Sequence, residues 1–286
     1  MSTEGSRSAD RVATAVLALL FSELIDDAAL FPPGDAPMAE AVLAHLSHDS
    51  GPHSRYLGRF LCQVSKLDEL RSTLSQDDDL RLGLIADTGL DGLKAAFDAL
   101  ADDDRFMLES AEIRHPGDRL AELEDALPYG VDAYVEIAPD AKQLLTTLAG
   151  RDRMHAKLRT GGTTAEAFPS PETVADFIVA CADLGVSFKC TAGLHRAARH
   201  TDEATGFTHF GFLNILVASS QLLEGPVVVK ELLTITDGAR LGGYLKGLDV
   251  EEAARVRDQF HGFGSCSFTE PIDDLTALSL LPKEDR

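Results

Sequence analysis

The sequence lacks any apolar run of the roughly 18 residues needed to cross a bilayer, and it is short of basic residues. Its 286 residues include 26 Lys and Arg against 47 Asp and Glu, which gives a formal net charge of −21. A chain this acidic repels the phosphate backbone of nucleic acids and the anionic surface of membranes. We therefore expect no nucleic acid and no membrane as a partner, and a small molecule instead.

Cysteines are few, and none stand in CxxC spacing. Four in 286 residues are too sparse for a disulfide scaffold, which predicts a reducing compartment and hence the cytoplasm. Near the start, Arg7 and Arg11 precede an apolar run at 12–21, as in a signal peptide, but no small-residue cleavage site follows. We therefore expect an N-terminal helical extension over 1–23.

Short apolar runs alternate with helical patterns along the chain, which is typical of a parallel sheet with crossover helices. Eight runs have the character of strands: 24–31, 56–64, 80–86, 106–113, 131–137, 154–160, 186–192 and 260–268. Helical segments separate them at 37–47, 66–75, 90–100, 118–126, 139–149 and 171–184, and over a longer stretch at 207–258.

Eight such units predict one α/β domain over 1–286, folded as a (β/α)8 TIM barrel. The stretch 197–258 is then an insertion or lid between the seventh and eighth strands. A doubly wound open sheet is the alternative, because a sequence does not show whether a sheet closes.

Three neighbouring predicted strands carry charged side chains on one face and apolar side chains on the other. The charged face includes Glu136 in the strand at 131–137, Lys157 at 154–160 and Lys189 at 186–192. The apolar faces suit packing against helices, so the charged faces are expected to point into the barrel. Burying such charges is costly unless they pair or take part in chemistry.

Two lysines side by side disfavour each other's protonation, so at least one is expected to have a lowered pKa. A neutral lysine amine is a nucleophile for carbonyl carbons, and the Schiff base that it forms stabilises a carbanion or enamine. Glu136 would move protons, or one of four carboxylates at other strand ends would do so. These four are Asp26, Asp87, Glu109 and Glu112. The alternative is a structural ladder of ion pairs inside the barrel.

The two lysine strands carry motifs of a known family. KLRTGG begins at Lys157, and after a predicted helix FKCTAGLHR contains Lys189. This resembles the deoxyribose-phosphate aldolase family of class I aldolases, whose sixth and seventh strands have the forms K-x-S-T-G and K-x-x-G-G-I-R. LIDDAALFPPGDAP near the start looks like that family's first strand, VEIAP like its fifth and GSCS like its eighth. The resemblance touches most of the chain and is strongest over 155–196.

The resemblance implies that Lys157 forms the Schiff base and that Lys189 keeps it neutral. It also implies that Thr160 and Gly161 match the Thr-Gly after the family's lysine, and it favours Asp26 as the ligand-side residue of the first strand.

The sequence departs from the family's pattern in three places. The proton-relaying aspartate of the fourth strand is missing, and FMLESAEIRH offers Glu109 or Glu112 in its place. The Gly-Gly that cradles phosphate in the seventh strand becomes Gly193–Leu194, and the leucine crowds a backbone nest. The insertion at 197–258 is the third. Together these departures favour a different substrate that carries no phosphate.

Candidates for substrate binding lie at the strand ends and in the loops that follow them. They are Arg159, Thr160, Gly161, Gly162, Gly193, His195, Arg196, Ser265 and Ser267. Backbone N–H groups near Gly161 suit an anion, His195 and Arg196 suit a carboxylate or phosphate, and the serines suit hydrogen bonds in the last loop. An ordinary loop role is the alternative for each.

These observations predict a Schiff-base-forming class I aldolase or lyase that makes or breaks a C–C bond in a small carbonyl compound. Its catalytic residues would be Lys157, Lys189, Glu136, Glu112 and Asp26, with no metal and no cofactor. One alternative is a metal-independent barrel isomerase or lyase whose lysines act as electrostatic clamps without an imine. Another is a non-catalytic barrel that binds a small molecule. A homo-oligomer is compatible with the sequence.

Overall fold

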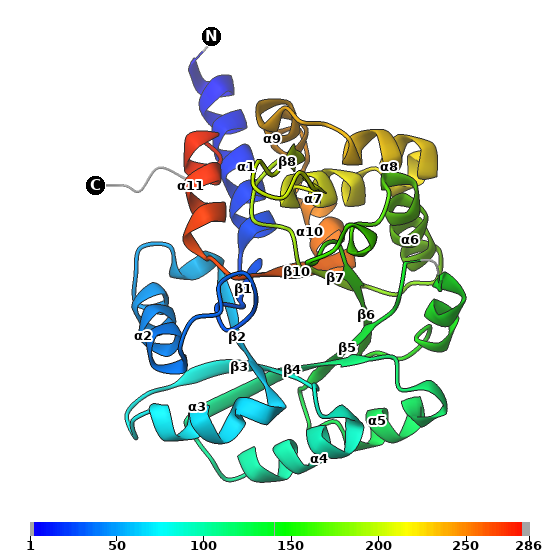
Figure 1. Cartoon of the computed structure of the whole chain (residues 1–286). Coiled ribbons are helices and arrows are strands. Elements are labelled where there is room, and N and C mark those ends of the chain that lie inside the picture. The colour runs from blue at the N-terminus through cyan, green and yellow to red at the C-terminus, as the bar shows by residue number, and fades with distance from the viewer. Residues whose placement is uncertain (1–2, 140, 282–286) are drawn as a thin grey trace.

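The structure is a computed structural model that describes residues 3–139 and 141–281. Eight parallel strands close into a barrel in the order β1, β10, β7, β6, β5, β4, β3, β2, and helices surround it (Figure 1). The predicted α/β (β/α)8 TIM barrel is confirmed. The open sheet is wrong, because β1 pairs in parallel with β2 on one side and with β10 on the other.

Each barrel strand overlaps one of the eight predicted runs. The strands are β1 (Ile25–Asp27), β2 (Leu57–Gln63), β3 (Leu80–Ile85), β4 (Phe106–Arg114), β5 (Asp132–Glu136), β6 (Met154–Arg159), β7 (Phe188–Thr191) and β10 (Phe260–Ser265). β1 is shorter than predicted because the chain turns after Asp27, where the Phe31 N–H donates to the Ala28 carbonyl. Pro32 and Pro33 follow and have no N–H with which to continue a strand ladder.

Helices form the outer layer. They are α1 (Thr3–Phe21), α2 (Met38–Asp49), α3 (Leu67–Thr73), α4 (Gly89–Leu100), α5 (Leu120–Ala126), α6 (Pro171–Asp183), α7 (Phe212–Ser220), α8 (Pro226–Leu233), α9 (Gly238–Lys246), α10 (Val250–Gln259) and α11 (Thr269–Ala277). α1 confirms the N-terminal extension and packs against α9 and α10. α6 begins where predicted, because the Ser170 hydroxyl accepts a hydrogen bond from the Thr173 N–H.

The helix predicted over 139–149 is wrong; residue 140 lies outside the described residues. A 3-10 turn, Lys142–Thr147, stands in that place. The hydroxyls of Thr146 and Thr147 donate to carbonyls three residues earlier. Such bonds compete with the regular helical pattern.

The stretch 197–258 is not a lid over its whole length. α7 to α10 follow β7 in the chain and belong to the outer layer of helices. Phe212 of α7 stacks on Phe263 of β10 with ring centroids 5.1 Å apart. Only a short hairpin, β8 (His200–Thr201) with β9 (Thr208–His209), approaches the carboxyl ends of the strands. There the His209 Nδ1 lies 3.3 Å from the Gly193 carbonyl oxygen.

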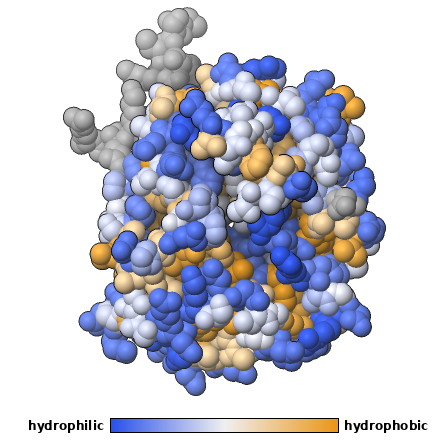
Figure 2. Space-filling view, in the orientation of Figure 1, coloured by the Kyte–Doolittle hydropathy of each residue, from blue (hydrophilic) through white to orange (hydrophobic). Residues whose placement is uncertain are grey.

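The outer surface agrees with the acidic composition. The face in Figure 2 is mostly hydrophilic, with apolar residues scattered over it. Within the described ranges, no helix is both long and apolar enough to cross a membrane. All four cysteines are free thiols, and Cys62, Cys181 and Cys190 are buried.

Barrel closure gives a first prediction. Gly262 of β10 has φ +146°, and an added Cβ would lie 2.6 Å from the Leu24 carbonyl oxygen, beside β1. We expect Gly262→Ala to lower the free energy of unfolding by about 2–4 kcal/mol, since both backbone strain and a steric clash result. Urea denaturation followed by circular dichroism measures the change.

The matched control is Gly243→Ala, at a helical glycine of α9 with nothing within 4 Å of an added Cβ. Alanine there should raise stability by about 0.5–1 kcal/mol. If Gly262→Ala and Gly243→Ala changed the free energy of unfolding equally, the close approach of Gly262 to Leu24 would not be what limits barrel closure.

Candidate active site

The inside of the barrel is charged, whereas the layer between strands and helices is apolar. On β5 and β6 the buried residues Ala133, Val135, Ala156 and Leu158 belong to the hydrophobic core. The alternate residues Glu136 and Lys157 meet inside the barrel, as predicted, and strand register pairs Lys157 with Lys189.

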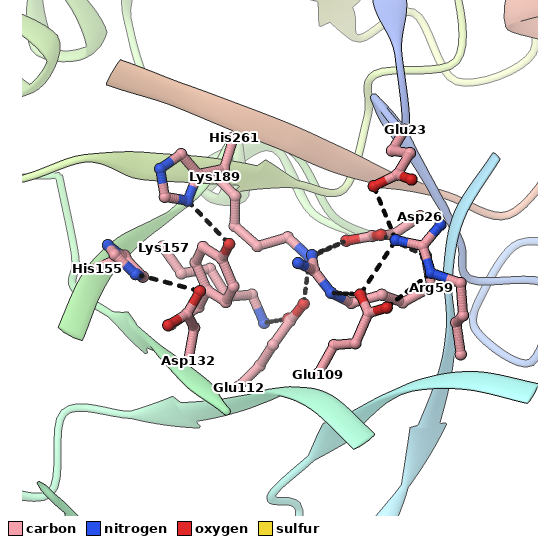
Figure 3. A network of polar contacts seen from close by, with 12 residues as sticks. Glu23, Asp26, Arg59, Glu109, Glu112, Asp132, His155, Lys157, Lys189 and His261 are labelled. Carbon is pink, nitrogen blue, oxygen red and sulfur yellow. Dashed lines mark hydrogen bonds and ion pairs between the residues drawn. The ribbon is translucent and has the colours of Figure 1, made fainter. Parts of the chain in front are cut away.

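Ten side chains of alternating charge form one continuous series of ion pairs through the barrel, and Figure 3 shows members of it between Lys157 and Glu23. We call this series the ion ladder. In order it contains Arg159, Glu136, Lys157, Glu112, Lys189, Asp26, Arg59, Glu109, Arg81 and Glu23, with successive N···O distances of 3.3, 3.1, 2.7, 2.5, 2.5, 3.6, 3.1, 2.7 and 2.8 Å. Its five cations and five carboxylates balance, which limits the cost of burying them.

Both ends of the ion ladder reach the surface, and its centre does not. The side chains of Glu112 and Lys189 are each 1% exposed. At the carboxyl ends of the strands, exposure rises to 6% for Lys157 and 17% for Glu136. At the amino ends it rises to 54% for Glu23. Lys157 is therefore the lysine nearer the carboxyl-end mouth, where barrel enzymes have their active sites.

Glu112 is the central acceptor. Its Oε2 lies 2.7 Å from the Lys157 Nζ and its Oε1 lies 2.5 Å from the Lys189 Nζ, so one carboxylate holds both ammonium groups (Figure 3). Burial by itself would raise the pKa of Glu112, but the two lysines outweigh it and lower the pKa to about 2.

The predicted lowering of a lysine pKa does not hold for Lys189. Burial alone would lower the pKa of Lys189, yet Asp26 and Glu112 hold it above its usual range. Asp26 in turn has a lowered pKa, because Lys189 and Arg59 outweigh the effect of its burial. Lys189 is thus a fixed ammonium between two carboxylates.

A bulge in β4 settles which glutamate of the fourth strand faces the lysines. Leu82 pairs with Leu108 and Gly83 pairs with Ser110, so Glu109 is an extra residue in the strand. Glu112 consequently points to the lysines, and Glu109 points to Arg59 and Arg81 near the amino end.

Of the other two predicted proton carriers, Asp87 lies outside the ion ladder and Asp26 lies within it. Asp87 binds the backbone N–H and the hydroxyl of Ser65 and is not part of the ion ladder. Asp26 faces inward as expected, while its neighbour Asp27 pairs with His45 of α2 at 3.0 Å.

Of the predicted substrate-binding residues, Arg159 belongs to the ion ladder through Glu136. The others join loops at the mouth. The buried Thr160 hydroxyl donates to the Ala192 carbonyl at 2.5 Å. The Gly161 backbone lies close to that of Gly193: a Cβ added to Gly161 would be 3.2 Å from the Gly193 Cα. A Cβ added to Gly162 would clash with Ala167.

The loop residues after β7 and β10 also have protein partners. His195 lies 3.6 Å from the Cys266 Sγ and 3.5 Å from Glu270. Arg196 pairs with Asp274 of α11 at 2.8 Å. The Ser265 hydroxyl donates to the Ser267 carbonyl, and the Ser267 hydroxyl accepts from the Glu270 N–H.

Sequence reasoning missed Arg59, Arg81 and Glu23 of the ion ladder and the polar cluster beside them. The Tyr134 hydroxyl lies 2.9 Å from the His261 Nδ1, and the Tyr134 ring centroid is 5.1 Å from the Lys189 Nζ. Arg59 and Arg81 occupy inward-facing positions of β2 and β3, so the alternation that found Lys157 would also have found them. His261 lies at a register shift of β10, between Phe260 and Gly262, and strand alternation does not give its direction there.

No family model matches the chain, and a search of curated proteins returns no match. Among residues 3–139 and 141–281, no group of three or more His, Cys, Asp or Glu side chains is arranged to hold a metal ion.

Glu112→Gln provides a test of the ion ladder. It leaves two buried ammonium groups with one fewer carboxylate, and we expect it to lower the free energy of unfolding by about 3–5 kcal/mol. Adding Lys189→Met should restore part of that loss, because one of the two ammonium groups that shared Glu112 is removed together with it. Urea denaturation of the two single variants and the double variant measures the coupling.

Glu122→Gln is the control, since Glu122 makes exposed ion pairs worth roughly 0–1 kcal/mol. A loss for Glu112→Gln no larger than that for Glu122→Gln would contradict the central role of Glu112.

The lowered pKa of Glu112 also predicts a dependence on pH. Its carboxylate adds stability that is complete above its ordinary pKa of 4.5 and is lost as the pH falls through about 2. We expect the stability difference between wild type and Glu112→Gln to be constant near neutral pH and to shrink below about pH 4.5. If the stability difference between wild type and Glu112→Gln grew as the pH fell, the lowered pKa of Glu112 would be contradicted.

Proposed function

We propose that the protein is a lyase of the class I aldolase type, in which Lys157 forms a Schiff base with a small carbonyl compound. The resemblance of KLRTGG and FKCTAGLHR to the deoxyribose-phosphate aldolase family supports this. The TIM barrel is compatible with it, although the fold hosts many other chemistries.

The observation that carries the proposal is the position of Lys157. Of the two lysines inside the barrel it is the one nearer the carboxyl-end mouth, and its Nζ has carboxylates at 2.7 and 3.1 Å. A lysine that served only to pair charges would not need to lie at the end where loops can hold a substrate.

The first step requires Lys157 to lose a proton. Glu136 accepts it across 3.1 Å, and its own lowered pKa, set by Lys157 and Arg159 against burial, keeps it ionised beforehand. The free amine then attacks the carbonyl carbon and a C–N bond forms. The carbonyl oxygen takes one proton from the attacking nitrogen and one back from Glu136 and leaves as water, so that Glu136 is again ionised.

The product of that step is an iminium ion, which keeps a positive charge at the Nζ position. Glu112, which pairs with the resting ammonium, therefore pairs equally with the iminium. Cleavage of the C–C bond sends its electron pair into the iminium and gives a neutral enamine, while Glu136 or water accepts the proton of the departing hydroxyl. Lys189, held as an ammonium, favours loss of the proton from its neighbour.

Reductive trapping tests the proposal. The protein is incubated with acetaldehyde, pyruvate or dihydroxyacetone, reduced with borohydride, and examined by intact-protein and peptide mass spectrometry. We expect one adduct in wild type, on the peptide that contains Lys157, and none in Lys157→Met. Lys142→Met is the control for non-specific reduction, because the Lys142 side chain is 51% exposed.

An adduct that persisted in Lys157→Met would remove Lys157 from its role. Turnover of a carbonyl compound without any trapped adduct would instead favour the electrostatic clamp, in which both ammonium groups stabilise an enolate. Thermal stabilisation by a ligand without turnover would favour a binding protein.

A further inference from the structure

A polar cavity of about 170 Å³ opens at the end of the barrel opposite to the mouth near Lys157. Its lining includes Glu23, Arg59, Arg81, Asp132, Arg257 and His261. These residues precede the strands or stand near their first positions, so the cavity lies at the amino ends, across the barrel from Lys157. The mechanism proposed for Lys157 makes no use of it.

Arg257 is the unusual group in this cavity. Its Nη1 donates to the Phe260 carbonyl and its Nη2 to the Ser22 carbonyl, each at 3.1 Å. Arg59 and Arg81 both have carboxylate partners in the ion ladder. In the described part of the chain, Arg257 has no carboxylate within ion-pair distance, and its direct partners are the two backbone carbonyls. Glu23 and Asp26 act on its charge only from a longer distance.

The surroundings of Arg257 are rigid. Its two carbonyl partners fix the guanidinium between the end of α1 and the start of β10. His261 is held by Tyr134, and burial, aided by His155 and Arg257, lowers the pKa of His261 to about 4. The imidazole is therefore uncharged near neutral pH and adds no second positive charge.

Glu23 shows a further sign of a built site. It is not a glycine, yet its φ is +48°, in the left-handed region. Such strained residues cluster at ligand clamps and active sites. Its carboxylate stands at the rim of the cavity and is held by Arg81 at 2.8 Å.

We propose that this cavity binds a small monocarboxylate with a hydroxyl group, and that Arg257 pairs with the carboxylate. A guanidinium with free N–H groups matches a carboxylate in a two-point arrangement. Glu23 and Asp132 supply acceptors for the hydroxyl and repel a dianion, which favours a monocarboxylate over phosphate. At roughly 30 Å³ per water-sized group, the volume admits about five or six non-hydrogen atoms.

Calorimetric titration of the full chain with glycolate tests this proposal. We expect saturable binding with a dissociation constant on the order of 1 mM, and no binding of the neutral analogue glycolamide. Arg257→Gln should weaken the binding about tenfold or more, because the charged partner is lost. Arg153→Gln is the matched control, since Arg153 also donates to backbone carbonyls at the amino ends but does not line the cavity.

A second measurement does not depend on the folding of Arg257→Gln. In wild type, the imidazole ¹⁵N resonances of His261, assigned with His261→Gln, should shift as glycolate is added. If glycolate gave neither a heat of binding nor a shift of the His261 resonances, the proposal would be overturned. Binding that survives Arg257→Gln but is lost in Lys157→Met would place glycolate at the other mouth, and phosphate binding as tight as glycolate would exclude the monocarboxylate class. None of these results bears on whether Lys157 forms a Schiff base.

Discussion

One carboxylate, that of Glu112, holds two lysine ammonium groups deep inside the barrel, and the rest of the interior is arranged around it. Lys157 and Lys189 lie at 2.7 and 2.5 Å from its two oxygens. Without Glu112 each lysine would keep one fewer partner in a region closed to water, which is costly. The apolar layer outside the strands supplies the stability that permits a charged interior.

The fold was predictable because each buried parallel strand is a short apolar run between helical patterns. All eight runs become strands, and the errors have local causes. The Pro32–Pro33 turn shortens β1, and threonine hydroxyls replace a helix with a 3-10 turn at Lys142–Thr147. Whether the sheet closes depends on contacts between β1 and β10, which are distant in sequence.

The site was predictable only in part. Period-two alternation placed Glu136, Lys157 and Lys189 inside the barrel, but it fails at a bulge, and therefore it left Glu109 and Glu112 undecided. Neighbouring lysines suggested mutual repulsion, whereas the structure separates their charges with a shared carboxylate. Such pairing depends on which strands face each other across the barrel, and a single strand's pattern does not contain that information.

The ion ladder also has a consequence for the order of folding. Its members come from seven of the eight barrel strands and from Glu23, and the Lys189–Asp26 pair joins residues 163 positions apart. Pairs between strands that closure brings together, such as Lys189–Asp26, form only as the barrel closes, so the charges at the centre stay hydrated until then. A strand that docked one residue out of register would turn a charge toward the apolar helix layer. The charged interior thus penalises incorrect closure and selects one strand register.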